Sequence, residues 1–462
     1  MWLKHILRKC RLLGLNGKNE PGRLVMMQRR LLGYLSRVLL TVALFLLMMP
    51  CLAQAPHDSG QSLPSPLTLA HALTLVSEAH PVLAQARASV DIATADRLTA
   101  SAQSDMELGI DARLRWVEPS PKAVDQRRQD HFARLYVRQL LFDFGRVQGL
   151  LDANDKNVLA QEYLLHYQNH QQRIAVMESF FDVILADMEY AHANETMAIQ
   201  FIRYDRMRDR HELGQQSEVD VLSTHSDYQL ARQVRHRKQL NQRVTRARLA
   251  QQLNQPKLLP DKLVKPQLMT YQRVLPDVNQ LLARLDEANL LLQALQIQLQ
   301  SAQDKIKVAR LGHYPSLYSE AEVAQYARNS GSSDRWRIGL VMNFPFYTGD
   351  RVKAGIHKQQ ALHDALQAQF REKKRQLEQL LLELTLNLEN LSLQREQANA
   401  SLEYRQLYLD RARALYEQEK TPDLGDAMIK LTYAELVMAR VDFEIALTWE
   451  KLNVITGKTL VD

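Results

Sequence analysis

Cysteine is almost absent from this chain. Its 462 residues include two cysteines, Cys10 and Cys51, and both lie near the N-terminus. The remaining residues can therefore form no disulfide and perform no thiol chemistry, so their stability has to come from the burial of apolar side chains. Glycine (16 residues) and proline (15 residues) are also scarce, which excludes a collagen-like or low-complexity chain.

Excess positive charge is confined to the N-terminus. The formal net charge is +7, but residues 1–53 hold nine of the 59 lysine and arginine residues and one of the 52 acidic residues. The rest of the chain is nearly neutral, with 50 basic and 51 acidic side chains. A neutral chain exerts no long-range attraction on phosphates, so we expect no nucleic acid partner.

Residues 1–53 have the pattern of a secretory signal peptide. Basic residues up to Arg37 precede an apolar run from Val38 to Met49, and the small-residue site Cys51-Leu52-Ala53 follows. The run has 12 residues, fewer than the roughly 20 that a membrane helix needs. The sequence predicts a leader cleaved after Ala53, an N-terminal linker at 54–66, and an exported mature chain without cysteine.

Two long stretches contain neither glycine nor proline, the residues that break helices. They span residues 150–213 (64 residues) and 356–421 (66 residues). Their apolar residues recur at coiled-coil spacing, at Ile174, Met177, Phe181, Leu185 and Met188 and at Leu377, Leu381, Leu384, Leu388 and Leu391. At 1.5 Å per residue, each predicted helix is on the order of 100 Å long.

Four other stretches alternate between apolar and polar residues, the period of a strand. In residues 107–117 and 335–344 the alternation is clean, with Leu108 and Ile110 on one face and Asp111 and Arg113 on the other. In the other two stretches it is weaker. We expect strands at about 105–117, 131–144, 317–328 and 335–347.

The order helix, two strands, long helix, shorter helix occurs twice, so the chain is internally duplicated. Residues of the first half recur in the second at an offset of about 205, since Phe142 and Gly145 correspond to Phe346 and Gly349. The sequence predicts repeats at 67–253 and 277–462, separated by a proline-rich linker at 254–276. The expected helices are 81–103, 147–213, 219–253, 277–311, 352–420 and 426–456.

Four amphipathic strands cannot close a membrane barrel alone, because the smallest such barrels have eight strands and open edges leave backbone groups unpaired in lipid. We therefore expect oligomerisation, with three copies giving twelve strands. Four aromatic residues are candidates for the membrane interface: Trp116, Tyr136, Tyr326 and Trp336. The alternative, a soluble sandwich, requires a second sheet or a helix over the apolar face.

Short motifs at the element junctions resemble those of one family. Residues 141–146 (LFDFGR) and 344–351 (FPFYTGDR) look like the strand-to-helix junctions of the outer membrane efflux protein family, also called the TolC family. His80-Pro81 resembles its helix start, Tyr314-Pro315-Ser316-Leu317 its helix-to-strand corner, and residues 214–222 (GQQSEVDVL) its periplasmic helix turn. The resemblance covers roughly residues 67–459.

The resemblance implies a mainly α fold with membrane β structure. Three chains would form a twelve-strand outer-membrane β-barrel, continued through the periplasm by an α-barrel tunnel of coiled-coil helices. Such a homotrimer is a passive exit duct for a tripartite efflux pump or a type I secretion system. Its implied partners are outer-membrane lipid, a periplasmic adaptor and an inner-membrane transporter.

The resemblance also implies roles for residues at the two helix turns. Seven of them would contact the adaptor: Gly214, Gln215, Gln216, Ser217, Lys420, Thr421 and Pro422. Three acids either line the closed end of the tunnel or cap the returning helices: Asp220, Asp423 and Asp426.

Two other classes of protein compete with a channel. A periplasmic coiled-coil scaffold without a pore would use the same helices, with its strands as an oligomerisation collar. An enzyme would need a catalytic constellation, yet no G-x-G-x-x-G, G-x-S-x-G or H-E-x-x-H motif occurs. We therefore expect no catalytic residue, no cofactor and no metal.

Overall fold

The computed structural model describes residues 64–457 with gaps at 77–78, 276, 330–333 and 419–423. The predicted signal peptide (1–53) lies outside these residues, as does most of the predicted linker at 54–66. The described part is mostly helical and contains one four-stranded antiparallel sheet, so the predicted mainly α fold with added β structure is confirmed.

Eight α-helices occur in the described part of the chain. They are α3 (Leu69–Thr74), α4 (Pro81–Ser101), α5 (Arg146–Glu212), α6 (Glu218–Gln252), α7 (Val278–Ala288), α8 (Leu290–Arg310), α9 (Arg351–Glu417) and α10 (Leu424–Ile455). The two long helices, α5 and α9, have 67 residues each. None of the helices in the described ranges is long and apolar enough to cross a lipid bilayer.

The sheet contains β1 (Glu107–Arg113), β2 (Phe132–Phe142), β3 (Ser316–Tyr326) and β4 (Trp336–Asn343) in that order. Each half of the chain supplies two neighbouring strands, and β2 pairs with β3 across the two halves. In the described chain β1 and β4 are the sheet edges. Their outer backbone groups are therefore open to pairing with another chain.

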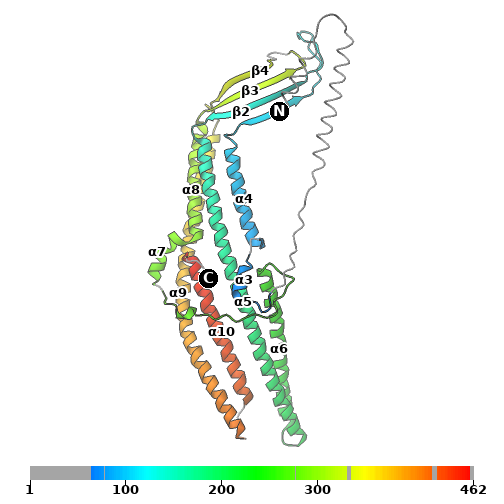
Figure 1. Ribbon diagram of the computed structural model, residues 1–462, viewed down its shortest axis with the longest axis vertical. Coiled ribbons are helices and arrows are strands. Elements are labelled where there is room, and N and C mark those ends of the chain that lie inside the picture. The colour runs from blue at the N-terminus through cyan, green and yellow to red at the C-terminus, as the bar shows by residue number, and fades with distance from the viewer. Residues whose placement is uncertain (1–63, 77–78, 276, 330–333, 419–423, 458–462) are drawn as a thin grey trace, which may run out of the picture. The chain divides into compact units, whose positions relative to one another are not determined.

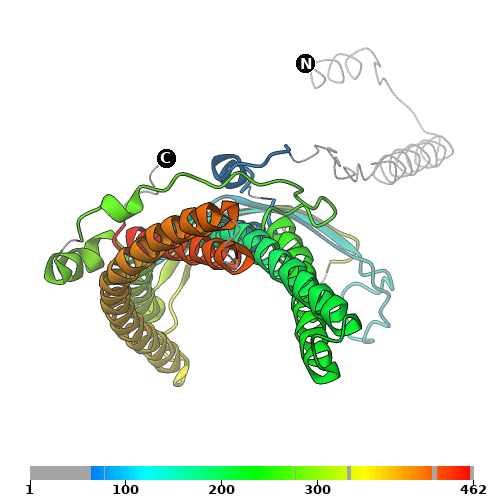
Figure 2. The same ribbon diagram turned by 90° about the horizontal axis from the view of Figure 1, so that it is seen from below.

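The strands and the hairpin turns lie at opposite ends of the long helices (Figure 1). Helices α4, α5, α8 and α9 lead away from the sheet, and α6 and α10 return beside α5 and α9. Seen along the helices, α9, α10, α5 and α6 follow one another in an arc (Figure 2). The linker between the halves crosses the outer, convex side of this arc.

The two larger of the three apolar clusters in the described residues hold most of the helices together. In the first, α5 packs against α6 and α10, and the rings of Phe181 and Phe443 stack with centroids 4.3 Å apart. In the second, α9 packs against α7, α8 and α10. The leucines that sequence spacing assigned to the α9 seam are buried there, so this prediction is confirmed: Leu377, Leu381, Leu384, Leu388 and Leu391.

The single helix predicted at 277–311 is wrong. The helix is interrupted at Asn289, whose φ of −78° and ψ of 117° are those of extended backbone. The Asn289 side chain accepts hydrogen bonds from the backbone N–H groups of Leu291 and Leu292 and donates one to the carbonyl of Ile455. This cap starts α8 and ties it to the end of α10.

Candidate channel surfaces and helix ends

The register of the strands places all charged residues of the sheet on one face. Asp111 of β1 lies opposite Arg134 of β2, and Glu322 of β3 lies opposite Arg337 of β4. Arg134 contacts Asp111 at 2.5 Å and Glu322 at 3.2 Å, and Arg337 contacts Glu322 at 2.7 Å. A row of ion pairs therefore crosses all four strands.

The other face of the sheet is apolar and uncovered. Leu108, Ile110, Ile338 and Leu340 are 65–76% exposed although each is a large aliphatic residue. These four residues belong to β1 and β4, in which apolar residues alternate with polar ones as the sequence predicts. A largely apolar exposed face of this kind marks a surface that contacts lipid or another protein.

Two of the four aromatic residues predicted at the membrane interface, Tyr136 and Tyr326, lie on the charged face of the sheet. Tyr136 donates a hydrogen bond to Glu107 at 3.2 Å, and the Tyr326 ring lies 5.9 Å from that of Phe132. In β2 and β3, aromatic and charged residues lie on the same face. The alternation of apolar and polar residues therefore did not show on which face Tyr136 and Tyr326 lie. Trp336 lies on the apolar face, and Trp116 continues the apolar alternation beyond β1.

The turn between α5 and α6 is a compact, capped structure. Gly214 has a φ of +71°, a left-handed conformation that favours glycine. Ser217 accepts a hydrogen bond from the backbone N–H of Asp220, and Asp220 accepts from the N–H and hydroxyl of Ser217. This capping box starts α6. It also brings the predicted adaptor-contact residues Gly214, Gln215, Gln216 and Ser217 together.

The turn between α9 and α10 is only partly described. Lys420, Thr421, Pro422 and Asp423 lie outside the described residues. Asp426 is in the first turn of α10, where its carboxylate lies 2.5 Å from the ammonium of Lys430. The hydrogen bond to Asp426 raises the pKa of Lys430, so this lysine stays charged at neutral pH.

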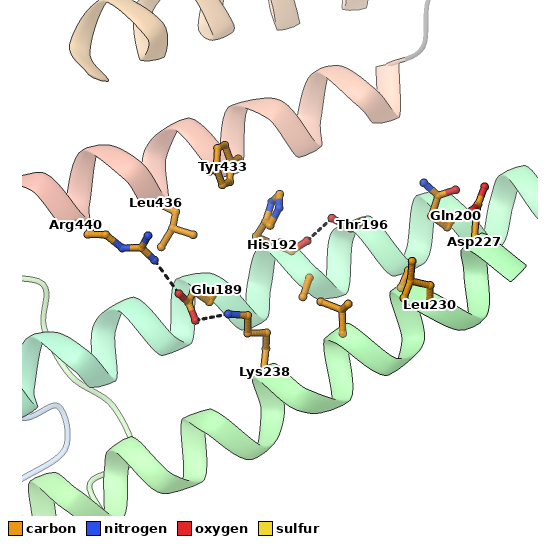
Figure 3. Close-up of a pocket in the computed structure, with 13 residues that line it drawn as sticks. Glu189, His192, Thr196, Gln200, Asp227, Leu230, Lys238, Tyr433, Leu436 and Arg440 are labelled. Carbon is orange, nitrogen blue, oxygen red and sulfur yellow. Dashed lines mark hydrogen bonds and ion pairs between the residues drawn. The ribbon is translucent and has the colours of Figure 1, made fainter. Parts of the chain in front are cut away.

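A groove of about 570 Å³ lies where α10 meets α5 and α6 (Figure 3). At one end, Glu189 of α5 contacts Lys238 of α6 and Arg440 of α10, both at 2.8 Å. One carboxylate thus links three helices from both halves of the chain. The sequence did not reveal this contact, because its partners are far apart in the chain and each reads as an ordinary surface charge.

Further along the same groove lies His192 of α5 (Figure 3). Its Nδ1 lies 3.1 Å from the hydroxyl of Thr432 of α10. That hydroxyl donates a hydrogen bond to Glu195 at 2.9 Å. Burial lowers the pKa of His192, although nearby Glu195 raises it. The imidazole is therefore neutral at pH 7, and this end of the α5–α10 contact depends on hydrogen bonds rather than on charge.

We expect Glu189→Gln to destabilise the helical part by about 1 kcal/mol, because the pairs are only partly buried and solvent screens them. Thermal loss of the helical circular dichroism signal measures this change. Glu212→Gln is the control, since Glu212 lies at the exposed end of α5, 3.9 Å from Arg208. Equal melting temperatures for the two variants would show that Glu189 contributes no more than a surface charge.

A sheet with an exposed apolar face and an ion-paired charged face, extended by long helical hairpins, is the architecture expected of an outer-membrane channel with a helical extension. Residues 281–444 match the family model described as outer membrane efflux protein. This match confirms the resemblance to the outer membrane efflux protein family that the junction motifs indicate. Members of this family are channel proteins. No curated protein sequence matches the chain.

Several solved structures of membrane proteins share this fold. The Campylobacter jejuni CmeC outer membrane channel has a TM-score of 0.70 at 13% identity, covering 85% of this chain and 87% of that one. A membrane protein from Pseudomonas aeruginosa has a TM-score of 0.68 at 16% identity, covering 84% and 90%. The outer membrane protein VceC from Vibrio cholerae has a TM-score of 0.65 at 14% identity, covering 84% and 96%. Because the sequence identities are only 13–16%, these matches show a shared fold and nothing further.

Proposed function

We propose that three copies of this chain form a passive exit duct through the outer membrane. The observation that supports this proposal is the two-faced sheet. Its apolar face suits lipid, its charged face suits water, and its two open edges need partners. Three sheets joined edge to edge would give the twelve strands that one chain cannot supply.

The helices would continue the duct into the periplasm. In one chain α9, α10, α5 and α6 already form an arc with their coiled-coil seams buried, and three arcs would enclose a tunnel. An inner-membrane transporter would deliver cargo through a periplasmic adaptor, within a tripartite efflux pump or a type I secretion system. The turn residues Gly214–Ser217 and Lys420–Pro422 are the proposed adaptor contacts.

The oligomeric state and the conductance test this proposal together. We expect the detergent-solubilised protein to have the mass of a trimer by light scattering and to conduct ions in planar lipid bilayers. A periplasmic scaffold would oligomerise but would not conduct. A monomer, or a trimer that does not conduct, would contradict the duct.

We further propose that Asp220, Asp423 and Asp426 face a constriction at the turn end of the tunnel. Threefold repetition would concentrate their negative charge around one axis and favour cations. Asp220 also has a capping role, so Asp220→Ala should cost about 1 kcal/mol of stability in addition to its effect on the current.

We expect Asp→Asn changes at these three positions to lower the cation preference of single channels in planar bilayers, because asparagine keeps a similar size without the charge. The control is Asp209→Asn, which removes an acid from the exposed end of α5 next to Arg208. If conductance and cation preference match the parent in all three turn variants, the acids act only as helix caps and ion-pair partners.

A further inference from the structure

The charged face of the sheet is electrically balanced. Within the four strands, acids and arginines are equal in number, four of each, and all eight lie on this face. They are Glu107, Asp111, Glu320, Glu322, Arg113, Arg134, Arg138 and Arg337. The opposite face has no charged residue within the strands.

Oppositely charged groups on this face are also close together. Arg138 lies 3.1 Å from Glu320 and its guanidinium lies 4.1 Å from the centre of the Tyr318 ring. Arg113 lies over the ring of Phe132 at 5.0 Å. The ion pairs on this face have N–O distances of 2.5–3.2 Å, much shorter than the Debye length of about 8–10 Å. The fields of the paired charges therefore largely cancel at the distance of a passing solute.

Glu322 of β3 forms ion pairs with arginines on both neighbouring strands. Its carboxylate contacts Arg134 of β2 at 3.2 Å and Arg337 of β4 at 2.7 Å, and its side chain is only 16% exposed. Arg134 has a second acid, Asp111, whereas Arg337 of β4 is ion-paired with Glu322 itself. Loss of the Glu322 carboxylate would therefore remove the acid that balances the charge of Arg337 on β4.

We infer that the sheet provides a charge-balanced lining of the duct, that it lets cargo of either sign pass, and that Glu322 maintains this balance. The inference rests on the proposed trimeric duct, in which the apolar face meets lipid and the charged face meets the passage. The sheet would then exclude no class of cargo by charge. Ion preference of the whole duct would arise at the helix turns instead.

Removing one charge at a time tests this inference, because each variant shifts the balance in a known direction. Glu322→Gln adds one net positive charge per chain and Arg337→Gln removes one. In the trimer each change occurs three times around the passage. We expect the cation-to-anion permeability ratio to fall roughly twofold in Glu322→Gln and to rise by a similar factor in Arg337→Gln.

The double variant, Glu322→Gln with Arg337→Gln, restores neutrality and should return the ratio to the parent value. Glu118→Gln is the matched control, since it removes an acid from the exposed loop beyond β1, where Glu118 pairs with Arg128. All variants are compared as trimers by reversal potential in a salt gradient across a planar bilayer.

The outcomes separate this inference from the proposed function. If the variants conduct but keep the permeability ratio of the parent, the sheet face does not control charge in the passage and the inference is wrong, while the duct stands. If the parent forms no conducting trimer, the proposed function itself fails. Should Glu322→Gln not assemble, the rise in the permeability ratio expected for Arg337→Gln and its reversal in the double variant still decide the question.

Discussion

Ile338→Arg should prevent assembly of most of the trimer. Ile338 lies on the apolar face of β4 and is 76% exposed, which the proposed barrel turns toward lipid. An arginine on the lipid face costs roughly 2–4 kcal/mol near the bilayer midplane, and a trimer contains the change three times. We expect the yield of heat-modifiable trimer in the outer-membrane fraction to fall at least tenfold.

Gly339→Arg is a stringent control for this change. It places the same side chain on the same strand, one residue away and on the opposite face, where it lies across from Glu320. A Cβ atom at Gly339 would meet no neighbouring atom within 4 Å. Near-parent yield is therefore expected, and equal yields for the two variants would refute the assignment of the lipid face.

The long helices were the most predictable part of the fold. Their existence follows from the absence of glycine and proline, and their seams follow from leucines every three or four residues, such as Leu381 and Leu384, which are buried as predicted. The break at Asn289 was not predictable, because asparagine is tolerated inside helices. Its side chain caps α8 and also donates a hydrogen bond to the carbonyl of Ile455, a partner 166 residues away that no local pattern indicates.

The faces of the sheet could be predicted only in part. In β1 and β4 the apolar and charged residues alternate cleanly, so the side of Ile110 and Ile338 was evident. In β2 the charged face also contains Phe132 and Tyr136, and the side of Tyr136 follows from its pairing with Gly109, where the missing side chain leaves room for the ring. Such cross-strand complementarity depends on register, which composition does not specify.

Contacts between the two halves of the chain were likewise invisible in the sequence. Glu189 accepts a hydrogen bond from Arg440 although the two residues are 251 positions apart in the sequence. Nothing in the local sequence around either residue distinguishes it from a solvated surface charge. The two repeats nevertheless meet along α5 and α10 through this contact and through the stacked rings of Phe181 and Phe443. This seam is therefore where a single substitution should affect both repeats at once.

Phe443→Ala should be among the most destabilising substitutions in the helical part. Phe443 and Phe181 are each 1% exposed, and their rings are nearly parallel, with an interplanar angle of 4°. Truncation of a buried phenylalanine costs about 3–5 kcal/mol, because apolar burial is lost and a cavity remains. Denaturant unfolding followed by circular dichroism should show this loss as a lower transition midpoint.

Phe443→Leu should lose much less stability, since leucine fills most of the space. Phe201→Ala is a second control, which tests whether truncation of any phenylalanine on these helices destabilises the protein to the same extent. Phe201 lies on α5, is 45% exposed and contacts Tyr228 with ring centroids 5.4 Å apart, so its truncation should cost about 1 kcal/mol. A destabilisation by Phe443→Ala no greater than that of Phe201→Ala would mean that the stacked pair does not join the two repeats. In that case the α5–α10 seam would depend on polar contacts such as those of Glu189 and His192.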